Sequence, residues 1–248
     1  MSEKPLSSRI ALVTGASRGL GHAFALALAK AGAHIVATAR TIGGLEELDD
    51  AIQAAGSTAT LVPLDIRDFA GIARLAASLN ERYGRLDILI GNAAILGGAL
   101  SPLEHVEPET WDEVMTVNVT ANWQLIRAMD PLLKKSDAGR VVLMSSGVAQ
   151  RPLAYWGVYQ ISKAALDVLG RTYAAETAST PIRVNLFAPG PTRTRMRATA
   201  MPGEDPMTLP SADEVAATIV PLCLPSFNET GKLYSFREGK LLAFQPPA

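Results

Sequence analysis

The feature that most constrains this chain is a regular alternation of short apolar runs with longer amphipathic stretches. The runs are rich in Val, Ile and Leu and apolar on both faces, as strands of a covered parallel sheet are. They lie at residues 10–13, 35–39, 59–64, 86–90, 140–144 and 183–187. Stretches of helical length separate them, at residues 21–31, 44–55, 69–83, 108–134 and 158–179. The alternation predicts an α/β architecture of right-handed βαβ units, doubly wound on both faces of one sheet.

The pattern continues without a linker as far as residue 190. A chain of 248 residues with this texture is predicted to form a single domain over residues 1–248. Residues 190–210 are rich in Pro, Met and Arg and only weakly periodic, so we expect them to form a mobile loop over the substrate site. A further helix is predicted at residues 211–222, with Ser211 as its N-cap.

Composition narrows the possible functions. The formal net charge is −1, and no basic excess points to nucleic acid. No run of apolar residues has the length of a membrane span or the position of a secretion signal. The one cysteine, Cys223, allows no disulfide within the chain and suits a reducing compartment. The histidines are scattered, so no metal site is expected. These features predict a cytoplasmic protein that binds neither nucleic acid nor membrane.

A glycine-rich turn follows the first predicted strand. It reads Thr14-Gly-Ala-Ser-Arg-Gly-Leu-Gly21 and leads directly into an alanine-rich helix. Glycines there let the backbone turn tightly and approach a pyrophosphate, whose charge is stabilised by the helix N-terminus. The glycine spacing differs from the common Gly-x-Gly-x2-Gly pattern, and an ordinary turn with a helix cap is the alternative. The position between first strand and first helix favours nucleotide binding.

The end of the second strand indicates which nucleotide. An acidic residue at this point would bind the ribose diol of NAD(H), but the strand ends at Ala39 and Arg40 follows. Together with Arg18 in the glycine turn, Arg40 would place two guanidinium groups beside a 2′-phosphate. NADP(H) is therefore predicted in preference to NAD(H). The alternative is that Arg40 only solvates the start of a helix.

The strongest chemical signal is Tyr159-x3-Lys163 at the start of a long helical stretch. Residues four apart share a helix face, so the phenol and the ammonium can serve the same small volume. A nearby ammonium and an oxidised nicotinamide both favour phenolate, and we expect them to lower the pKa of Tyr159 toward neutrality. An exposed helix pair is the alternative.

Two further polar sites support that interpretation. Ser145 and Ser146 follow the strand at 140–144, and ligands of open α/β sheets bind beyond the carboxyl ends of the strands. A serine hydroxyl there could hold a substrate oxygen while Tyr159 moves its proton. Asn118 lies inside the helical stretch 108–134, where Asn is mildly unfavourable. It is either a buried amide satisfied by backbone or a helix irregularity that positions a water near Lys163.

In this order and spacing the motifs resemble the short-chain dehydrogenase/reductase family over nearly the whole chain. The matching positions are Thr14-Gly-x3-Gly-x-Gly21, Asp65, Gly91-Asn-Ala-Ala94, Asn118, Ser146, Tyr159-x3-Lys163 and Pro189-Gly190. The amino-acid sequence of several loop segments is most similar to a branch of bacterial members without an assigned substrate. The resemblance implies a Rossmann-like fold with a seven-stranded parallel sheet in the order 3-2-1-4-5-6-7 and helices on both faces.

The resemblance also implies a role for individual residues. Tyr159 would be the catalytic acid/base, Lys163 would lower its pKa and bind the nicotinamide ribose, Ser146 would polarise the carbonyl and Asn118 would anchor a relay water. Asp65 would contact the adenine and Asn92 would line the cofactor channel. The full set of expected cofactor-binding residues is Gly15, Ser17, Arg18, Gly19, Leu20, Gly21, Arg40, Asp65, Ile66, Asn92, Ala93, Tyr159, Lys163, Pro189, Gly190, Thr192 and Thr194.

The sequence departs from the family at two places. The usual Asn-Asn-Ala-Gly reads Gly91-Asn92-Ala93-Ala94, and the common glycine-rich C-terminal close is replaced by Tyr234-Ser-Phe-Arg-Glu-Gly239. The predicted function is hydride transfer between NADP(H) and a small-molecule carbonyl or alcohol. The alternative is a sensor or regulator that binds NADP(H) without turnover, although such a protein would not need the four polar residues together. The resemblance further implies a homodimer or homotetramer.

Overall fold

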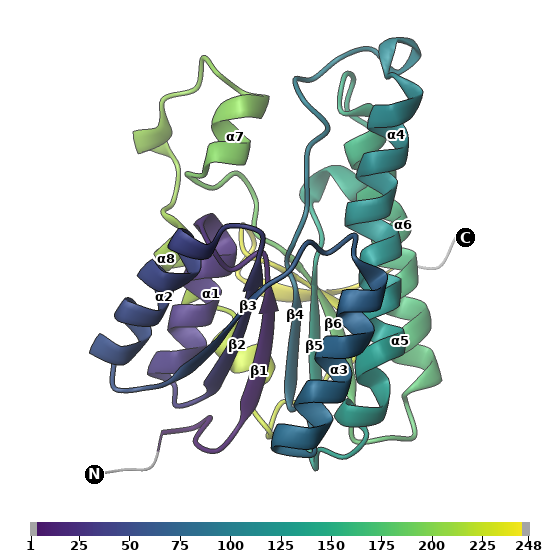
Figure 1. Cartoon of the computed structure of the whole chain (residues 1–248). Helices are drawn as coiled ribbons and strands as arrows, with labels where there is room; N and C mark the ends of the chain where they lie inside the picture. The colour runs from purple at the N-terminus through teal and green to yellow at the C-terminus, as the bar shows by residue number, and fades with distance from the viewer. Residues whose placement is uncertain (1–3, 245–248) are drawn as a thin grey trace.

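The computed structural model describes residues 4–244, and its strands form one eight-stranded sheet in the order β3-β2-β1-β4-β5-β6-β7-β8 (Figure 1). Neighbouring strands run parallel except β7 and β8, which pair antiparallel. The strands are β1 (Ile10–Thr14), β2 (His34–Ala39), β3 (Ala59–Pro63), β4 (Ile88–Gly91), β5 (Arg140–Met144), β6 (Arg183–Ala188), β7 (Lys232–Ser235) and β8 (Lys240–Ala243). The predicted doubly wound order is confirmed for the first seven strands.

The prediction of seven strands is corrected by β8. The chain reverses after β7 through a turn in which Gly239 has a φ of 63°, a conformation that glycine adopts without strain. The returning residues then pair with β7 in a hairpin, with Leu233 opposite Leu242. The segment 234–239, where the sequence departs from the family, is thus the end of β7 and the turn that adds a strand to the sheet edge.

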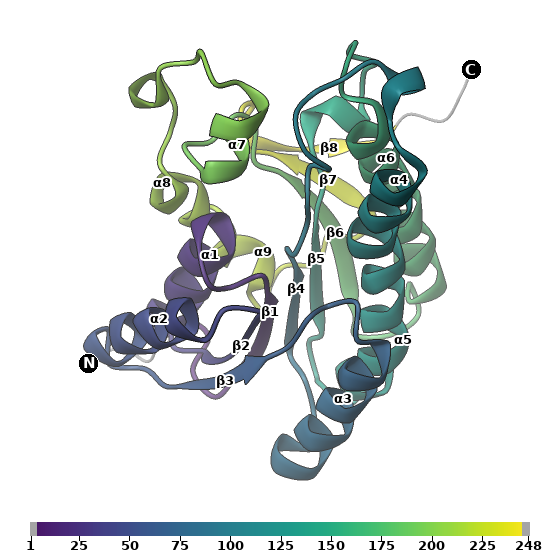
Figure 2. The ribbon, with the colours of Figure 1, turned by 45° about the horizontal axis from the view of Figure 1, so that its top comes forward.

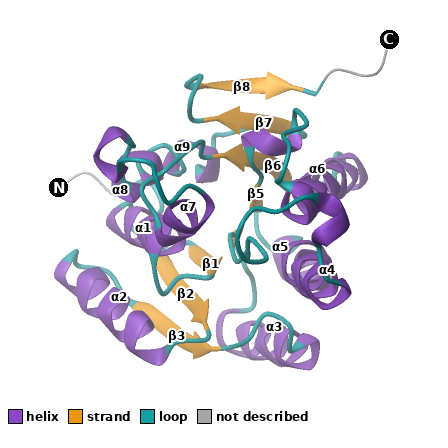
Figure 3. Ribbon diagram, turned by 90° about the horizontal axis from the view of Figure 1, so that it is seen from above, coloured by secondary structure: helices purple, strands orange, loops and turns teal. Residues whose placement is uncertain are grey.

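Two helical layers cover the sheet, as the view from above shows (Figure 3). On one face the apolar residues of the strands pack with those of four helices, and on the other they pack with the remaining long helices. The first layer is α1 (Gly19–Lys30), α2 (Ile42–Ala54), α8 (Ala212–Ala216) and α9 (Val220–Cys223), and the second contains α3 (Phe69–Tyr83), α5 (Ala121–Leu133) and α6 (Gly157–Glu176), with α4 (Pro108–Met115) packed against α6. Neighbouring residues of one strand, such as Leu12 and Val13, point to opposite faces of the sheet and pack in different core clusters. Burial on both faces explains why the strands are apolar throughout.

Three predicted segments differ in detail from the structure. The helical stretch 108–134 is α4 and α5 joined by a π-helical turn, η2 (Thr116–Thr120). Residues 190–210, expected to be a loop, contain the short helix α7 (Arg195–Ala200) and a 3-10 turn (Pro206–Thr208). The helix expected at 211–222 begins with Ser211 as N-cap, as predicted, but ends after α8 and resumes as α9. Pro221 accounts for the interruption, because its ring nitrogen has no hydrogen to donate within a continuous helix.

Within residues 4–244, no helix is long and apolar enough to cross a membrane.

Candidate active site

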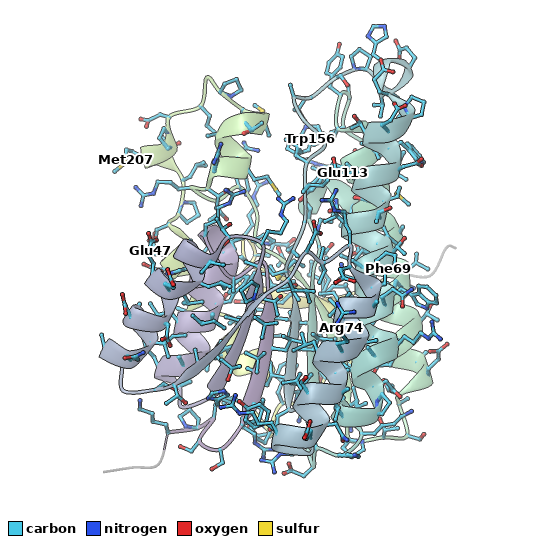
Figure 4. The ribbon with its side chains drawn as sticks, viewed as in Figure 1. Glu47, Phe69, Arg74, Glu113, Trp156 and Met207 are labelled. Atoms are coloured by element: carbon cyan, nitrogen blue, oxygen red, sulfur yellow. The ribbon has the colours of Figure 1, made fainter. Side chains whose placement is uncertain are left out.

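A cavity of about 1410 Å³ lies at the carboxyl ends of the strands. Helix α7 stands on one side of it, and α4 and α6 stand on the other (Figure 2). Every predicted site residue lines this cavity except Asn118. Figure 4 shows two further lining residues, Trp156 and Glu113, on the side of α4 and α6. Residues that are far apart in the sequence therefore line one cavity at the carboxyl ends of the strands, where open α/β proteins bind ligands.

The glycine turn forms the floor of one end of the cavity. Gly15 and Gly19 have positive φ angles, and a Cβ on Gly21 would lie 2.3 Å from the carbonyl oxygen of Gly15. Glycine is thus required here by conformation and by close approach. Helix α1 begins at Gly19 with no side chain capping its N-terminal N–H groups. Those donors remain available to an anion in the cavity.

Asn92 braces this turn against β4. Its Nδ2 donates to the carbonyl oxygen of Thr14 at 2.8 Å and to that of Gly15 at 3.3 Å. Its own N–H donates to the Thr14 hydroxyl at 3.0 Å, as does that of Ala93. The Gly91-Asn92-Ala93-Ala94 departure leaves this bracing intact, because the contacts use the Asn92 amide and the backbone.

Positive charge is concentrated in the cavity wall. Its cationic residues are Arg18, Arg40, Arg151, Lys163, Arg193, Arg195, Arg197 and Arg237. Its carboxylates are Asp65, Glu113 and Glu238, and each pairs with a cation: the first two with Arg67, the third with Lys240. The chain as a whole carries a net charge of only −1. Such segregation raises the local concentration of an anionic ligand.

The arginines of the cavity wall differ in whether they are paired with a carboxylate. Arg197 binds Glu204 through two nitrogens at 2.6 Å each. Arg18 and Arg40, in contrast, are exposed and make no ion pair within residues 4–244. In the same cavity wall as Arg40, Asp65 accepts hydrogen bonds from Arg67 with both of its carboxylate oxygens, and this interaction keeps the pKa of Asp65 below its usual value.

Tyr159 and Lys163 point into the same volume from the first turns of α6. The Lys163 Nζ lies 5.7 Å from the centroid of the Tyr159 ring and donates to the carbonyl oxygen of Met144 at 2.6 Å. Both side chains are buried. The alternative of an exposed helix pair is therefore excluded.

Burial dominates the electrostatics of this pair. It raises the pKa of Tyr159 to about 12, although the nearby Ser146 hydroxyl acts in the opposite direction. It lowers the pKa of Lys163 to about 8, against the opposing charge of Asp167. The direction for Tyr159 is opposite to the one expected from the sequence, because desolvation of the phenolate outweighs the favourable contacts that the protein itself supplies.

The serines that follow β5 have different surroundings. Ser146 caps the 3-10 turn η3 (Gly147–Ala149), where its Oγ accepts weakly from the N–H of Val148 at 3.4 Å, and it lines the cavity. Ser145 is 3% exposed, and its Oγ has no hydrogen-bond partner in the described part of the chain.

Asn118 lies behind the cavity wall, in the π-helical turn. Its Nδ2 donates to the carbonyl oxygen of Ile95 and to the hydroxyl of Ser162, both at 2.9 Å, and its Oδ1 accepts from the N–H of Ile95. Ser162 in turn donates to the carbonyl oxygen of Tyr159 at 2.7 Å. Both sequence interpretations are thus realised in part: the helix is irregular at this point, and the amide is satisfied within the protein. Its contacts tie the loop after β4 to the first turn of α6.

Sequence reasoning missed Gln150 and Asp167. Gln150 lines the cavity, and its Nε2 donates to Asp167 Oδ2 at 2.6 Å. A signal for Asp167 was present, since it continues the four-residue spacing of Tyr159 and Lys163 along one helix face. No local signal marks Gln150, because only the folding of the 147–153 segment onto α6 brings it to the cavity. In residues 4–244, no group of three or more His, Cys, Asp or Glu side chains could hold a metal ion.

Comparison with known proteins is consistent with this geometry. Residues 9–205 match the family model described as short chain dehydrogenase. The chain is 37% identical over 243 residues to the uncharacterized oxidoreductase YciK of Escherichia coli (strain K12), covering 95% of this chain and 94% of that protein.

Two solved structures share the fold over nearly their whole length. A short chain dehydrogenase from Pseudomonas syringae superposes with a TM-score of 0.91 at 38% identity, covering 94% of this chain and 96% of that one. One from Shigella flexneri 2a str. 301, complexed with NADP, has a TM-score of 0.90 at 35% identity, covering 94% and 99%. The chain belongs to the short-chain dehydrogenase family of oxidoreductases.

Proposed function

We propose that this protein is an NADP(H)-dependent oxidoreductase that acts on the carbonyl or alcohol group of a small molecule. The observation that carries the proposal is the meeting of Ser146, Tyr159 and Lys163 with the glycine turn in one positively charged cavity. A protein that only sensed the nucleotide would need the turn and the positive charge but not the buried tyrosine and lysine.

The residues present fit NADP(H). The uncapped N-terminus of α1 and the glycine turn would hold the pyrophosphate. A side chain at Gly21 would collide with the Gly15 carbonyl and the Asn92 amide, and so would prevent the tight turn that presents these N–H groups. Arg18 and Arg40 would bind the 2′-phosphate. The Shigella flexneri relative, which was solved in complex with NADP, supports this choice of cofactor.

Bound NADP(H) would supply or accept the hydride. The Ser146 hydroxyl would donate a hydrogen bond to the substrate oxygen and so stabilise the negative charge that develops on it. With a pKa of about 12 in the protein alone, Tyr159 is a phenol at neutral pH and can give its proton to that oxygen during reduction.

Oxidation requires the reverse proton transfer, for which Tyr159 must become a phenolate. The Lys163 ammonium favours that state, because an opposite charge nearby stabilises the ionised form. Asn118 would keep the first turn of α6 in place through Ser162. Both Nδ2 hydrogens are used within the protein, and Oδ1 and the backbone carbonyl oxygen each accept one hydrogen bond, so a relay water would donate to a second lone pair of one of these oxygens.

The proposal is tested by measuring NADPH consumption over a panel of ketones, aldehydes and quinones. Tyr159→Phe should lower kcat by about 10²–10⁴-fold, the usual effect of losing a general acid. The affinity for NADPH, measured by fluorescence titration, should remain close to that of the unchanged protein. Most of the activity surviving in this variant would refute the assignment, and NADPH binding without turnover of any panel member would favour the sensor.

A further inference from the structure

Asp167 is a buried carboxylate on the same face of α6 as Tyr159 and Lys163. It is 4% exposed and lies four residues beyond Lys163, one helical turn further from the start of α6. Its Oδ2 accepts from Gln150, and its Oδ1 has no hydrogen-bond partner in the region that the structure describes. Burial of an ionised group with half of its acceptors unused costs free energy, so this residue calls for an explanation.

Several groups face this carboxylate from the neighbouring elements. They are the Ser145 hydroxyl after β5, the Gln150 amide after η3, and the Lys163 and Arg171 cations of α6 itself. Burial raises the pKa of Asp167 to about 6, while all four groups favour the ionised form. The Ser145 hydroxyl is close enough to contribute but lies outside hydrogen-bonding geometry. Asp167 is therefore ionised at neutral pH.

Asp167 acts on Lys163 through its charge and not through a hydrogen bond. Within residues 4–244, the Lys163 Nζ makes no ion pair and donates to the carbonyl oxygen of Met144. Among the charged groups that the structure describes, Asp167 is the one that favours the protonated form of this buried lysine. An asparagine would serve equally well as the hydrogen-bond acceptor for Gln150, so the negative charge itself needs a role.

We propose that Asp167 is a positioning residue that keeps Lys163 an ammonium and holds Gln150 in the cavity wall. The inference rests on the proposed function, because it assigns a use to the charge of Lys163 beside Tyr159. It adds a third residue to the face of α6 that carries Tyr159 and Lys163. The Tyr159 phenol moves the proton, the Lys163 ammonium stabilises the phenolate, and the Asp167 carboxylate stabilises the ammonium.

Asp167→Asn tests the charge with little change of shape. Removal of a nearby negative charge makes an acid release its proton at lower pH, so the titration midpoint of Lys163 should fall. The midpoint is followed by NMR of the lysine ε-methylene in protein with labelled lysine, with the signal assigned by Lys163→Arg. A fall of half a pH unit or more is expected, which is about a threefold larger dissociation constant. An unchanged midpoint would overturn the proposal.

Gln150→Ala is the matched control, because it removes the hydrogen bond and leaves the charge. It should leave the Lys163 midpoint in place while raising KM for a substrate that touches this wall. If Gln150→Ala moved the midpoint as far as Asp167→Asn does, the charge would not be the cause and the inference would fail.

The unaltered protein offers a second measurement that needs no folded variant. The Lys163 signal should show an additional inflection near pH 6, where Asp167 takes up its proton. Its absence would count against the coupling.

In the reductive assay, the alkaline limb of kcat should move to lower pH in Asp167→Asn. If no substrate were turned over, the proposed function would fail while the NMR titration still decided this inference.

Discussion

Buried polar groups at the two ends of the sheet differ in how fully they are hydrogen-bonded. At the amino ends of the strands, the fully buried Asp87 accepts from Arg9, Arg85, the Ser136 hydroxyl and the N–H of Ile10. The nearby Arg140 is 3% exposed and donates to the carbonyl oxygens of Gly139, Pro181, Leu224 and Pro225.

At the carboxyl ends, the acceptors are left partly unused. The buried side-chain atoms without a partner in residues 4–244 are Ser145 Oγ, Asp167 Oδ1 and Asn122 Oδ1. The first two adjoin the active site, and the third lies beside Gly91 at the end of β4. Buried polar networks stabilise a fold when all members are satisfied, and departures from that rule are typical of functional sites. One end of the sheet therefore satisfies its buried polar groups within the protein, and the other leaves buried acceptors without partners beside the cavity.

Replacing one serine at each end is the sharpest test of this contrast. Ser146→Ala removes the donor to the substrate oxygen and should lower kcat by about 10²–10³-fold. Ser136→Ala removes a hydroxyl that donates to Asp87 at 2.6 Å, and should cost about 1–3 kcal/mol of stability with little effect on kcat. Steady-state kinetics and urea unfolding measure both. A large loss of activity in Ser136→Ala would break the comparison.

Asp87→Ala should produce the largest loss of stability. It leaves Arg9, Arg85 and Ser136 without their shared acceptor, and breaking a buried charge network of this kind costs about 3 kcal/mol. The midpoint of urea unfolding should fall, while turnover per folded molecule stays near that of the unaltered protein. An unchanged midpoint would show that the amino end of the sheet is not a stabilising network.

The variants Arg18→Gln and Arg40→Gln test the positive charge at the carboxyl ends of the strands. Each removes a cation assigned to the 2′-phosphate, so the Kd for NADPH should rise about tenfold while that for NADH changes little. Arg74→Gln is the matched control, because this exposed arginine lies on α3 and pairs with Asp68 (Figure 4). Equal affinity of the unaltered protein for the two nucleotides would contradict the NADP(H) assignment.

The smallest expected effect is a pH dependence of reduction. Burial lowers the pKa of Lys163 to about 8, so its ammonium is present below that pH and is lost above it. Turnover limited by the hydride step should therefore fall as the pH rises through about 8. A rate that stayed level well into the alkaline range would show that the charge of Lys163 is not needed for reduction.

Much of the architecture and the site could be predicted because their signals are local. Apolar runs alternating with helical stretches predicted a doubly wound α/β sheet, while the order of its first seven strands came from the family resemblance. The predicted helix at 69–83 coincides with α3. Ser211 was identified as an N-cap from its position alone, and it forms a full capping box with Glu214. The spacing of Tyr159 and Lys163 placed them on one helix face, where the structure has them.

What escaped prediction depends on contacts between distant segments. The strand β8 forms because residues 240–243 pair with β7, the edge strand of the parallel sheet. The helix predicted at 211–222 is divided at Pro221. Asn118 lies behind the cavity wall because Ile95 and Ser162 take up its amide.

The sequence by itself determined the doubly wound sheet, the glycine turn and the residues that gather at the strand ends, because backbone periodicity and conformational preference act over a few neighbouring residues. Only the tertiary structure decided how far each group is buried and which charge it faces. The shifted pKa values of Tyr159, Lys163 and Asp167 follow from that burial. Desolvation and charge interactions depend on atoms brought together by the whole fold.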